Sequence, residues 1–124
     1  MADEITYSVR LSAVKGDINI KREHLNKLVT MTGDAYSAGV QSIPTTAGGT
    51  ALSIAAAVGT PGLAIVINQD ATNYVDLGVE NGGTFYPAIK LKPGEGNFIR
   101  FGSELTHARA DTGAVLLEMF ILED

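Results

Sequence analysis

One short segment near the end of the chain carries a residue pattern used in catalysis. Asp111-Thr112-Gly113 matches the D-T-G signature of aspartic proteases, in which two such loops bring two carboxyl groups together to share a proton. Only eleven residues follow Gly113, too few for the flap and support elements that follow this loop in those enzymes. Asp-x-Gly between two strands is also an ordinary hairpin turn. We interpret the segment as a turn and predict that the chain is not an enzyme; a protease using Asp111 is the enzymatic alternative.

A second segment is similar to the glycine motif of a cupin. Pro93-Gly94-Glu95 precedes His107, but a metal-binding cupin needs a histidine pair beside this motif together with further ligands. The chain has two histidines, His24 and His107, which are far apart in sequence. Catalytic zinc takes three protein ligands. We therefore predict that both histidines are polar strand residues, and that a non-metal cupin is a model for architecture only.

Other ligand-binding patterns are incomplete. Asp70, Asp76 and Glu80 are acidic and close in sequence, but no D-x-D-x-D-G calcium loop is present. Gly48-Gly49-Thr50 and Gly82-Gly83-Thr84 lack the Gly-Lys-Ser/Thr that completes a phosphate loop. The G-x-S-x-G elbow of serine hydrolases is also missing. The sequence predicts no cofactor and no metal.

Size and charge set the class of protein. The chain has 124 residues and no cysteine, which indicates one domain spanning 1–124 and excludes disulfides and thiolate metal sites. Its formal net charge is −5, and its densest basic group is Lys21-Arg22 with Lys27. Nucleic-acid binding proteins show a basic stripe with stacking aromatics. We expect no nucleic-acid partner.

Two observations bear on location. The start, Met1-Ala2-Asp3-Glu4, is acidic and lacks the basic residues and apolar stretch of a signal peptide. The longest apolar stretch, Ala51 to Ile67, is broken by Gly59, Pro61 and Gly62, so we expect no membrane span. Absence of disulfides favours assembly in a reducing cytoplasm.

Charged residues make up only 19% of the chain, whereas about a quarter is usual in soluble proteins. This low fraction points to apolar subunit contacts.

The second half of the chain reads as short strands separated by Gly-containing turns. This regular spacing predicts an all-β antiparallel sandwich or jelly-roll-like barrel. Pro87 cannot donate to a strand ladder, so it should lie at an edge or a bulge. The predicted strands are Gly62–Asn68, Asn73–Val79, Thr84–Lys92, Asn97–Phe101, Glu104–Ala110 and Ala114–Leu122.

The first half is less regular. Residues 5 to 13 alternate apolar and polar side chains, which is typical of a half-buried strand, and Lys15-Gly16-Asp17 is a turn signal. Ile18 to Met31 fits a strand or a helix; we favour a strand because no helix cap is evident. Tyr36 to Ile43 is short and mixed, and we expect the apolar run Leu52 to Val58 to be a strand.

The last predicted strand is apolar on both faces. Val115, Leu117, Met119 and Ile121 alternate with a second apolar set that Glu118 interrupts. A strand with one face exposed to solvent should show a regular alternation of apolar and polar residues. The strand is therefore central, or its second face meets another subunit. The interface residues that we predict are Leu116, Glu118, Phe120 and Leu122.

Three stretches of the chain resemble small structural proteins of tailed bacteriophages. They are Asn68 to Val79, Ile89 to Glu95 and Ala108 to Asp124, and the short acidic start with its alternating strand is similar as well. The resemblance covers most of the chain and is weakest from Thr45 to Val58. Some proteins of this kind are jelly-roll or β-sandwich cement proteins, which lie as dimers or trimers over capsomer junctions. The family has no catalytic residues.

The resemblance implies a virion protein assembled in the host cytoplasm. We expect a capsid decoration protein that binds itself, as a dimer or trimer, and the major capsid protein. The alternative is a tail or receptor-binding module that recognises host glycan. The absence of tryptophan weakens that alternative, because carbohydrate platforms usually expose Trp or Tyr.

Overall fold

A computed structural model describes residues 4–124, so the acidic start Met1–Asp3 lies outside the described residues. The chain divides into two compact units, Met1–Thr32 and Gly33–Asp124. The expectation that residues 1–124 form one domain stays a prediction. Residues 4–124 contain no helix long and apolar enough to cross a membrane.

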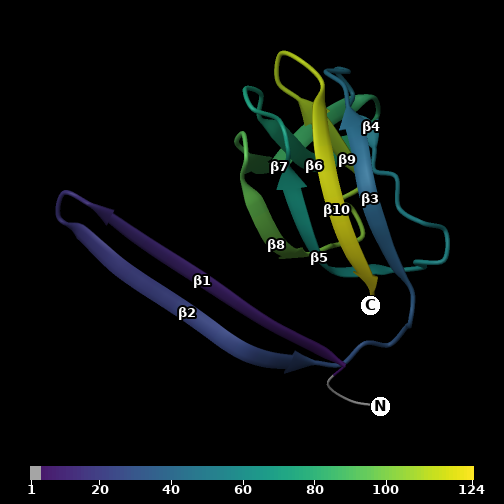
Figure 1. Ribbon diagram of the computed structural model, residues 1–124. Helices are drawn as coiled ribbons and strands as arrows, with labels where there is room; N and C mark the ends of the chain where they lie inside the picture. The colour runs from purple at the N-terminus through teal and green to yellow at the C-terminus, as the bar shows by residue number, and fades with distance from the viewer. Residues whose placement is uncertain (1–3) are drawn as a thin grey trace. The chain divides into compact units, whose positions relative to one another are not determined.

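The first unit is a two-stranded antiparallel hairpin, β1 (Ile5–Lys15) and β2 (Ile18–Val29) (Figure 1). Both predicted strands are confirmed, and the helical alternative for residues 18–31 is wrong. Gly16 has a φ of 56°, which suits the first central position of a type II′ turn, the form that matches the twist of paired strands. Near the other end, Asn26 bulges at a φ of 54° and its N–H donates to Ser8 Oγ at 2.9 Å.

The expectation that the first strand is half-buried is wrong. From Ser8 to Lys15 the side chains of β1 are exposed, including Leu11 with 65% of its surface accessible. The alternation is real, but a two-stranded ribbon has no second layer of its own to cover its apolar face.

The second unit is a sandwich of two four-stranded antiparallel sheets (Figure 1). The prediction of an all-β antiparallel sandwich is confirmed, although no closed barrel forms among the described residues. The first sheet has the order β3-β10-β5-β8, with strands Tyr36–Ile43, Val115–Glu123, Pro61–Asn68 and Gly96–Arg100. The second has the order β4-β9-β6-β7, with strands Thr50–Ala51, His107–Ala110, Val75–Asn81 and Thr84–Leu91.

The core lies between the two sheets. Strand β10 contributes four alternate side chains that are at most 4% exposed, because successive residues of a strand point to opposite faces. They pack with Ile43, Ala64 and Val66 of the first sheet and with residues of the second. The second-sheet members of this cluster are Val75, Leu77, Leu91, Ala108 and Ala110. This shared apolar layer holds the sandwich together.

Pro87 lies where the sequence places it. Strand β7 is the edge strand of the second sheet, and its pairing with β6 shifts register where Gly78 meets Pro87. Proline has no N–H to donate to a neighbouring strand, and an edge strand or a bulge is where that donor is not needed. The prediction of an edge or a bulge is confirmed in both respects.

Three details of the strand assignment differ from the structure. The run Leu52–Val58 is a loop and not a strand, because the N–H groups of Ser53 and Ala55 bond to side chains of β3. Residues Gly102 to Leu105 form a turn, so the strand expected from Glu104 begins at His107. The consecutive apolar residues of β5 are those of a strand covered on both faces, but Ile65 is 48% exposed, so one face of β5 is open.

A buried amide joins the two sheets at one end of the sandwich. Asn68, the last residue of β5, is fully buried, and its Nδ2 donates to the carbonyl oxygens of Asn73 at 2.9 Å and Leu91 at 3.0 Å. Its Oδ1 accepts the N–H of Asp70 at 2.8 Å. Buried polar groups must find partners, and here the partners are backbone groups of the 70–73 loop and of the end of β7.

A carboxylate at the end of β10 holds the entry to β3. Glu123 Oε1 accepts the N–H groups of Asp34 at 3.1 Å and Ala35 at 3.3 Å, while Oε2 accepts the N–H of Gly59 at 2.8 Å. A Cβ at Gly33 would collide with this carboxylate, so a larger residue there would displace Glu123 from these bonds. The Gly59 bond first, and then the Ala35 bond, lower the pKa of Glu123 below its ordinary value.

These bonds predict a pH-dependent contribution to stability. A lowered pKa in the folded state means that ionised Glu123 stabilises the fold above the ordinary Glu pKa, and that this stabilisation is lost as the pH falls through the lower, folded-state value. We expect Glu123→Gln to lower the urea midpoint at pH 7, and the difference from the parent to shrink below about pH 4. Glu104→Gln, at an exposed position, serves as the control. A deficit of equal size at every pH would contradict the assignment.

Candidate interaction surface

The predicted interface residues of β10 share one face of the first sheet. Leu116, Glu118, Phe120 and Leu122 alternate with the buried residues of the strand and point away from the core. Because β10 lies between β3 and β5, this face is bordered by strands on both sides (Figure 1). The structure therefore brings all four residues together on a sheet surface. Whether they form an interface stays a prediction.

Neighbouring strands add apolar side chains to the same face. Phe120 lies opposite Ala38 of β3 and Ile65 of β5, and Ile65 in turn lies opposite Phe98 of β8. Directly opposed residues of antiparallel strands project to the same side. The Tyr36 and Phe120 rings stack with centroids 5.7 Å apart and an interplanar angle of 17°. We call this surface the outer face; it comprises Tyr36, Ala38, Val40, Ile65, Ile67, Phe98, Leu116, Glu118, Phe120 and Leu122.

The outer face is more apolar than a solvated sheet surface usually is. Five of its large apolar side chains are about half exposed: Tyr36 61%, Val40 53%, Leu116 51%, Ile65 48% and Phe120 46%. Contiguous exposed apolar surface on a soluble domain marks a contact site. Glu118 is the charge in its middle, where its Oε1 accepts a hydrogen bond from Gln69 Nε2 at 2.7 Å. The face is suited to bind another flat apolar surface that carries one basic side chain opposite Glu118.

Sequence reasoning found the β10 residues and missed their neighbours. Tyr36, Ala38 and Val40 do alternate with polar residues, but this short segment reads as mixed when taken alone. Ile65 is hidden in a run that is apolar at consecutive positions. The missing information is the register, which sets Phe120 between β3 and β5 and which alternation within one strand does not supply.

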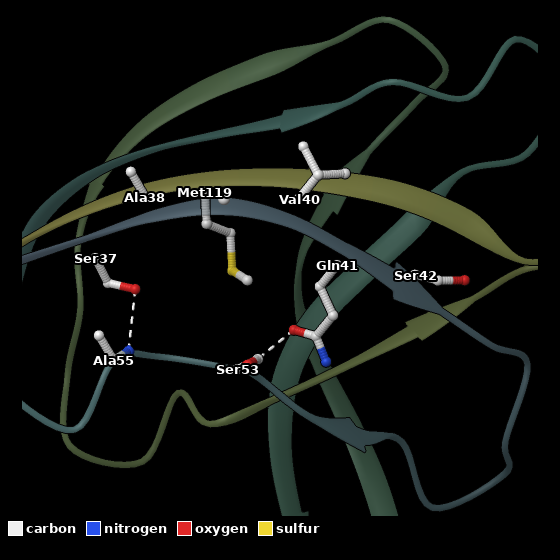
Figure 2. Close-up of a pocket in the computed structure, with 9 residues that line it drawn as sticks. Ser37, Ala38, Val40, Gln41, Ser42, Ser53, Ala55 and Met119 are labelled. Carbon is white, nitrogen blue, oxygen red and sulfur yellow. Dashed lines mark hydrogen bonds between the residues drawn. The ribbon is translucent and has the colours of Figure 1, made fainter.

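A hollow of about 490 Å³ lies beside β3 and contains no titratable group. Figure 2 shows Ser37 and Gln41 of β3 pointing toward the 53–55 segment. Ser37 Oγ accepts the N–H of Ala55 at 3.0 Å, and Gln41 Oε1 accepts that of Ser53 at 2.8 Å. Gln41 Nε2 donates to Ala51 O at 2.9 Å. The Ser37 and Gln41 side chains are therefore used in holding the loop.

A polar cluster lies on the second sheet. Asp76 of β6 stands between Lys90 of β7 and Arg109 of β9 in the strand register, and only 7% of its surface is exposed. Burial raises the pKa of the Asp76 carboxyl, while Lys90 and Arg109 act to lower it. Lys90 Nζ lies 4.0 Å from the centroid of the Tyr74 ring. Hollows of about 410 and 350 Å³ flank the cluster.

The segments that first suggested chemistry lie in turns. Asp111-Thr112-Gly113 is an exposed bend between β9 and β10, where Thr112 Oγ1 donates to Asn73 Oδ1 at 2.7 Å. Pro93-Gly94-Glu95 lies in the turn between β7 and β8, closed by a bond from Glu95 N to Lys92 O at 3.0 Å.

The two histidines belong to different units. His24 is in β2 of the hairpin, and His107 is in β9 of the sandwich. Both are strand residues, as the sequence predicts. His107 Nδ1 lies 2.8 Å from Thr106 Oγ1, and its Nε2 is 4.0 Å from Glu80 Oε2. Within residues 4–124, no three His, Cys, Asp or Glu side chains are grouped so as to hold a metal ion.

Adjacent leucines of β10 give a matched test of which face is surface. Leu117 is fully buried and Leu116 is half exposed. We expect Leu117→Ala to lower the free energy of unfolding by about 2–5 kcal/mol, because it leaves a cavity in the core. Leu116→Ala should cost about 1 kcal/mol or less. Urea denaturation of both variants measures the difference, and equal losses would show that Leu116 is not a surface residue of the folded chain.

Comparison of the chain with protein-family models, with curated proteins and with solved structures found no match.

Proposed function

We propose that this chain is a virion structural protein that decorates a bacteriophage head and stabilises it through contact. The observation that carries the proposal is the half-exposed apolar outer face of the first sheet. The phage-like segments of the sequence supply the biological setting. Two pieces of these segments, Asp111-Thr112-Gly113 and Pro93-Gly94-Glu95, lie in turns of the sandwich.

The mechanism is multivalent binding. Leu116, Phe120 and Leu122 supply apolar area that loses water on contact, and Glu118 supplies a charge that selects the partner. One such face gives a modest affinity. Copies arranged as a dimer or trimer, bound over a junction of the major capsid protein, add their contacts through a high effective concentration. Weak individual interfaces then hold neighbouring capsomers together.

The proposal predicts specific binding to heads. In virions of the phage that encodes the chain, quantitative mass spectrometry should find on the order of hundreds of copies, as a head lattice requires. In co-sedimentation with heads that lack the chain, Phe120→Asp should bind about tenfold more weakly or worse, because it places a charge in the contact. Tyr86→Asp is the matched control, since Tyr86 is 53% exposed on the other sheet. A few copies per virion, or no sedimentation of the parent with heads, would refute a decoration role.

The polar cluster of the second sheet favours one alternative, recognition of host glycan by a tail component. Tyr74 supplies an aromatic ring, and Asp76, Lys90 and Arg109 supply polar groups beside two open hollows. Sugars are bound by this combination of ring stacking and charged hydrogen bonds.

This alternative predicts glycan binding that depends on Tyr74. On a glycan array, the parent should bind a defined set of sugars, and Tyr74→Ala should abolish that signal. Tyr36→Ala, at an exposed tyrosine of the first sheet, should leave it unchanged. An array without signal for the parent, together with stable attachment to heads, removes the alternative.

A further inference from the structure

The hairpin has one apolar face that its own two strands cannot bury. Val9 pairs with His24, Leu11 with Arg22, Ala13 with Ile20 and Lys15 with Ile18, and paired residues share a face. Leu11 is 65% exposed, Ile20 58% and Ile18 51%. We call this surface the arm face; it comprises Val9, Leu11, Ala13, Lys15, Ile18, Ile20, Arg22 and His24. Isolated two-stranded hairpins are at best marginally stable and need a packing partner.

The opposite face of the hairpin is ionic. Glu23 lies between two cations, with Arg10 Nη2 at 3.2 Å from Oε2 and Lys21 Nζ at 3.0 Å from Oε1. Exposed ion pairs of this kind remain well solvated and need no protein cover. The hairpin is therefore amphipathic in the way of a strand pair that lays one side on another surface, and the arm face is the side to be covered.

The charges of the two units are opposite. The first unit, residues 1–32, carries five Lys or Arg and four acidic residues, a net formal charge of +1 that includes +3 on residues 5–29. Residues 33–124 carry four Lys or Arg and ten acidic residues, a net of −6. Arg22 on the arm face has no ion-pair partner within the described part of the chain, and Glu118 on the outer face is bonded only to the neutral Gln69. The arm face and the outer face thus complement each other in apolar character and in charge.

We propose that the β1–β2 hairpin is an exchange arm, whose arm face packs on the outer face of a second copy of this chain. The inference rests on the proposed function and assigns the outer face to the second copy of the proposed dimer. Phe120→Asp then weakens head binding by weakening the assembly whose contacts add together. In the assembly, Leu11 and Ile20 lie against the Phe120 and Ile65 side chains of the other copy, and Arg22 neutralises Glu118. The ionic side of the arm stays in water.

The area is sufficient for a specific dimer. A two-stranded ribbon of this length presents a face of about 36 by 10 Å, since strands rise about 3.3 Å per residue and lie about 4.8 Å apart. Reciprocal exchange of two arms then buries about 1,400 Å² in total, within the range of specific protein–protein interfaces. A single arm buries about half of that, which favours closed, symmetric exchange.

The connection between the units favours a second copy over the arm's own sandwich. Gly33 N donates to Asp124 O at 3.1 Å, and Glu123 fixes the two residues that follow. Only Thr30 to Thr32 separate this pinned segment from the end of β2, and three residues span at most about 10 Å. Short connections between two units promote exchange between copies.

The first test is the oligomeric state of full-length variants by sedimentation velocity. Leu11→Thr with Ile20→Thr removes apolar area from the arm face while keeping residues that favour strands. We expect the dissociation constant of the assembly to rise at least tenfold. Val14→Thr is the matched control, because Val14 is 79% exposed on the ionic face, and it should assemble like the parent. Unchanged assembly of the arm-face variant overturns the proposal.

The second test does not depend on how far a variant weakens the fold. The chain has no cysteine, so Ile20→Cys and Phe120→Cys each introduce a single thiol. Mixed chains treated with a short bismaleimide should form a cross-linked dimer joined between positions 20 and 120, as located by peptide mass spectrometry. A chain that carries both cysteines can also be treated with the bismaleimide. If it forms only a cross-link within one molecule, the arm packs on its own sandwich and the proposal is overturned. Absence of any 20–120 cross-link overturns it as well.

These outcomes are separable from those of the decoration proposal. If the arm-face variant binds heads normally and no 20–120 cross-link forms, the exchange arm is refuted and decoration is not. Cross-linked dimers that bind no heads would support the exchange arm and remove decoration.

Discussion

The pleat of β10 is the constraint on which the rest of this molecule depends. Its odd-numbered residues from Val115 to Ile121 form the middle of the core, and the even-numbered ones necessarily project to the other side. A two-layer sandwich can bury only one side of each sheet. A central strand that is apolar on both sides therefore leaves apolar surface outside its own fold. That surplus explains why the outer face exists.

Side-chain hydrogen bonds at both ends of the sandwich fix the position of β10 and so the shape of the surface that it carries. At one end Asn68 closes the sandwich with bonds to three backbone groups, and it is satisfied in full although it is completely buried. At the other end Glu123 collects three N–H groups from two loops. Both side chains replace strand ladders where the chain leaves the sheets. Because Glu123 also fixes the residues just after the hinge, the point from which the arm departs is set by the same strand that carries the outer face.

The strand ladder was predictable because each of its signals is local. Alternation and turn residues identified β5 to β10 to within a few residues, and Pro87 identified an edge and a bulge. The loop at Leu52–Val58 was not predictable in this way, since the groups that replace its ladder are the side chains of Ser37 and Gln41, which lie on a different strand. Alternation in β1 likewise shows a strand, but it cannot show whether the layer that covers the strand belongs to the same unit.

The candidate site divides along the same line. Leu116 and Phe120 were found because the excess of apolar residues lies within one strand, whereas Tyr36 and Ile65 required the register across three strands. The net charge of the whole chain also hides how charge is distributed between the hairpin and the sandwich. A net of −5 hides a basic hairpin joined to an acidic sandwich, and only the division into units at Gly33 separates them.

That separation bears on specificity as well as on attraction. Two arms that met face to face would bring like positive charges together, and two outer faces would bring like negative charges together, so both of these apolar pairings are opposed electrostatically. An arm on an outer face is the one combination that covers apolar area and pairs opposite charges. Discrimination of this kind comes from disfavouring the wrong contacts as much as from favouring the right one. Apolar sheet surfaces by themselves bind one another without selecting a geometry, so a charge rule of this kind would set the geometry of the proposed assembly.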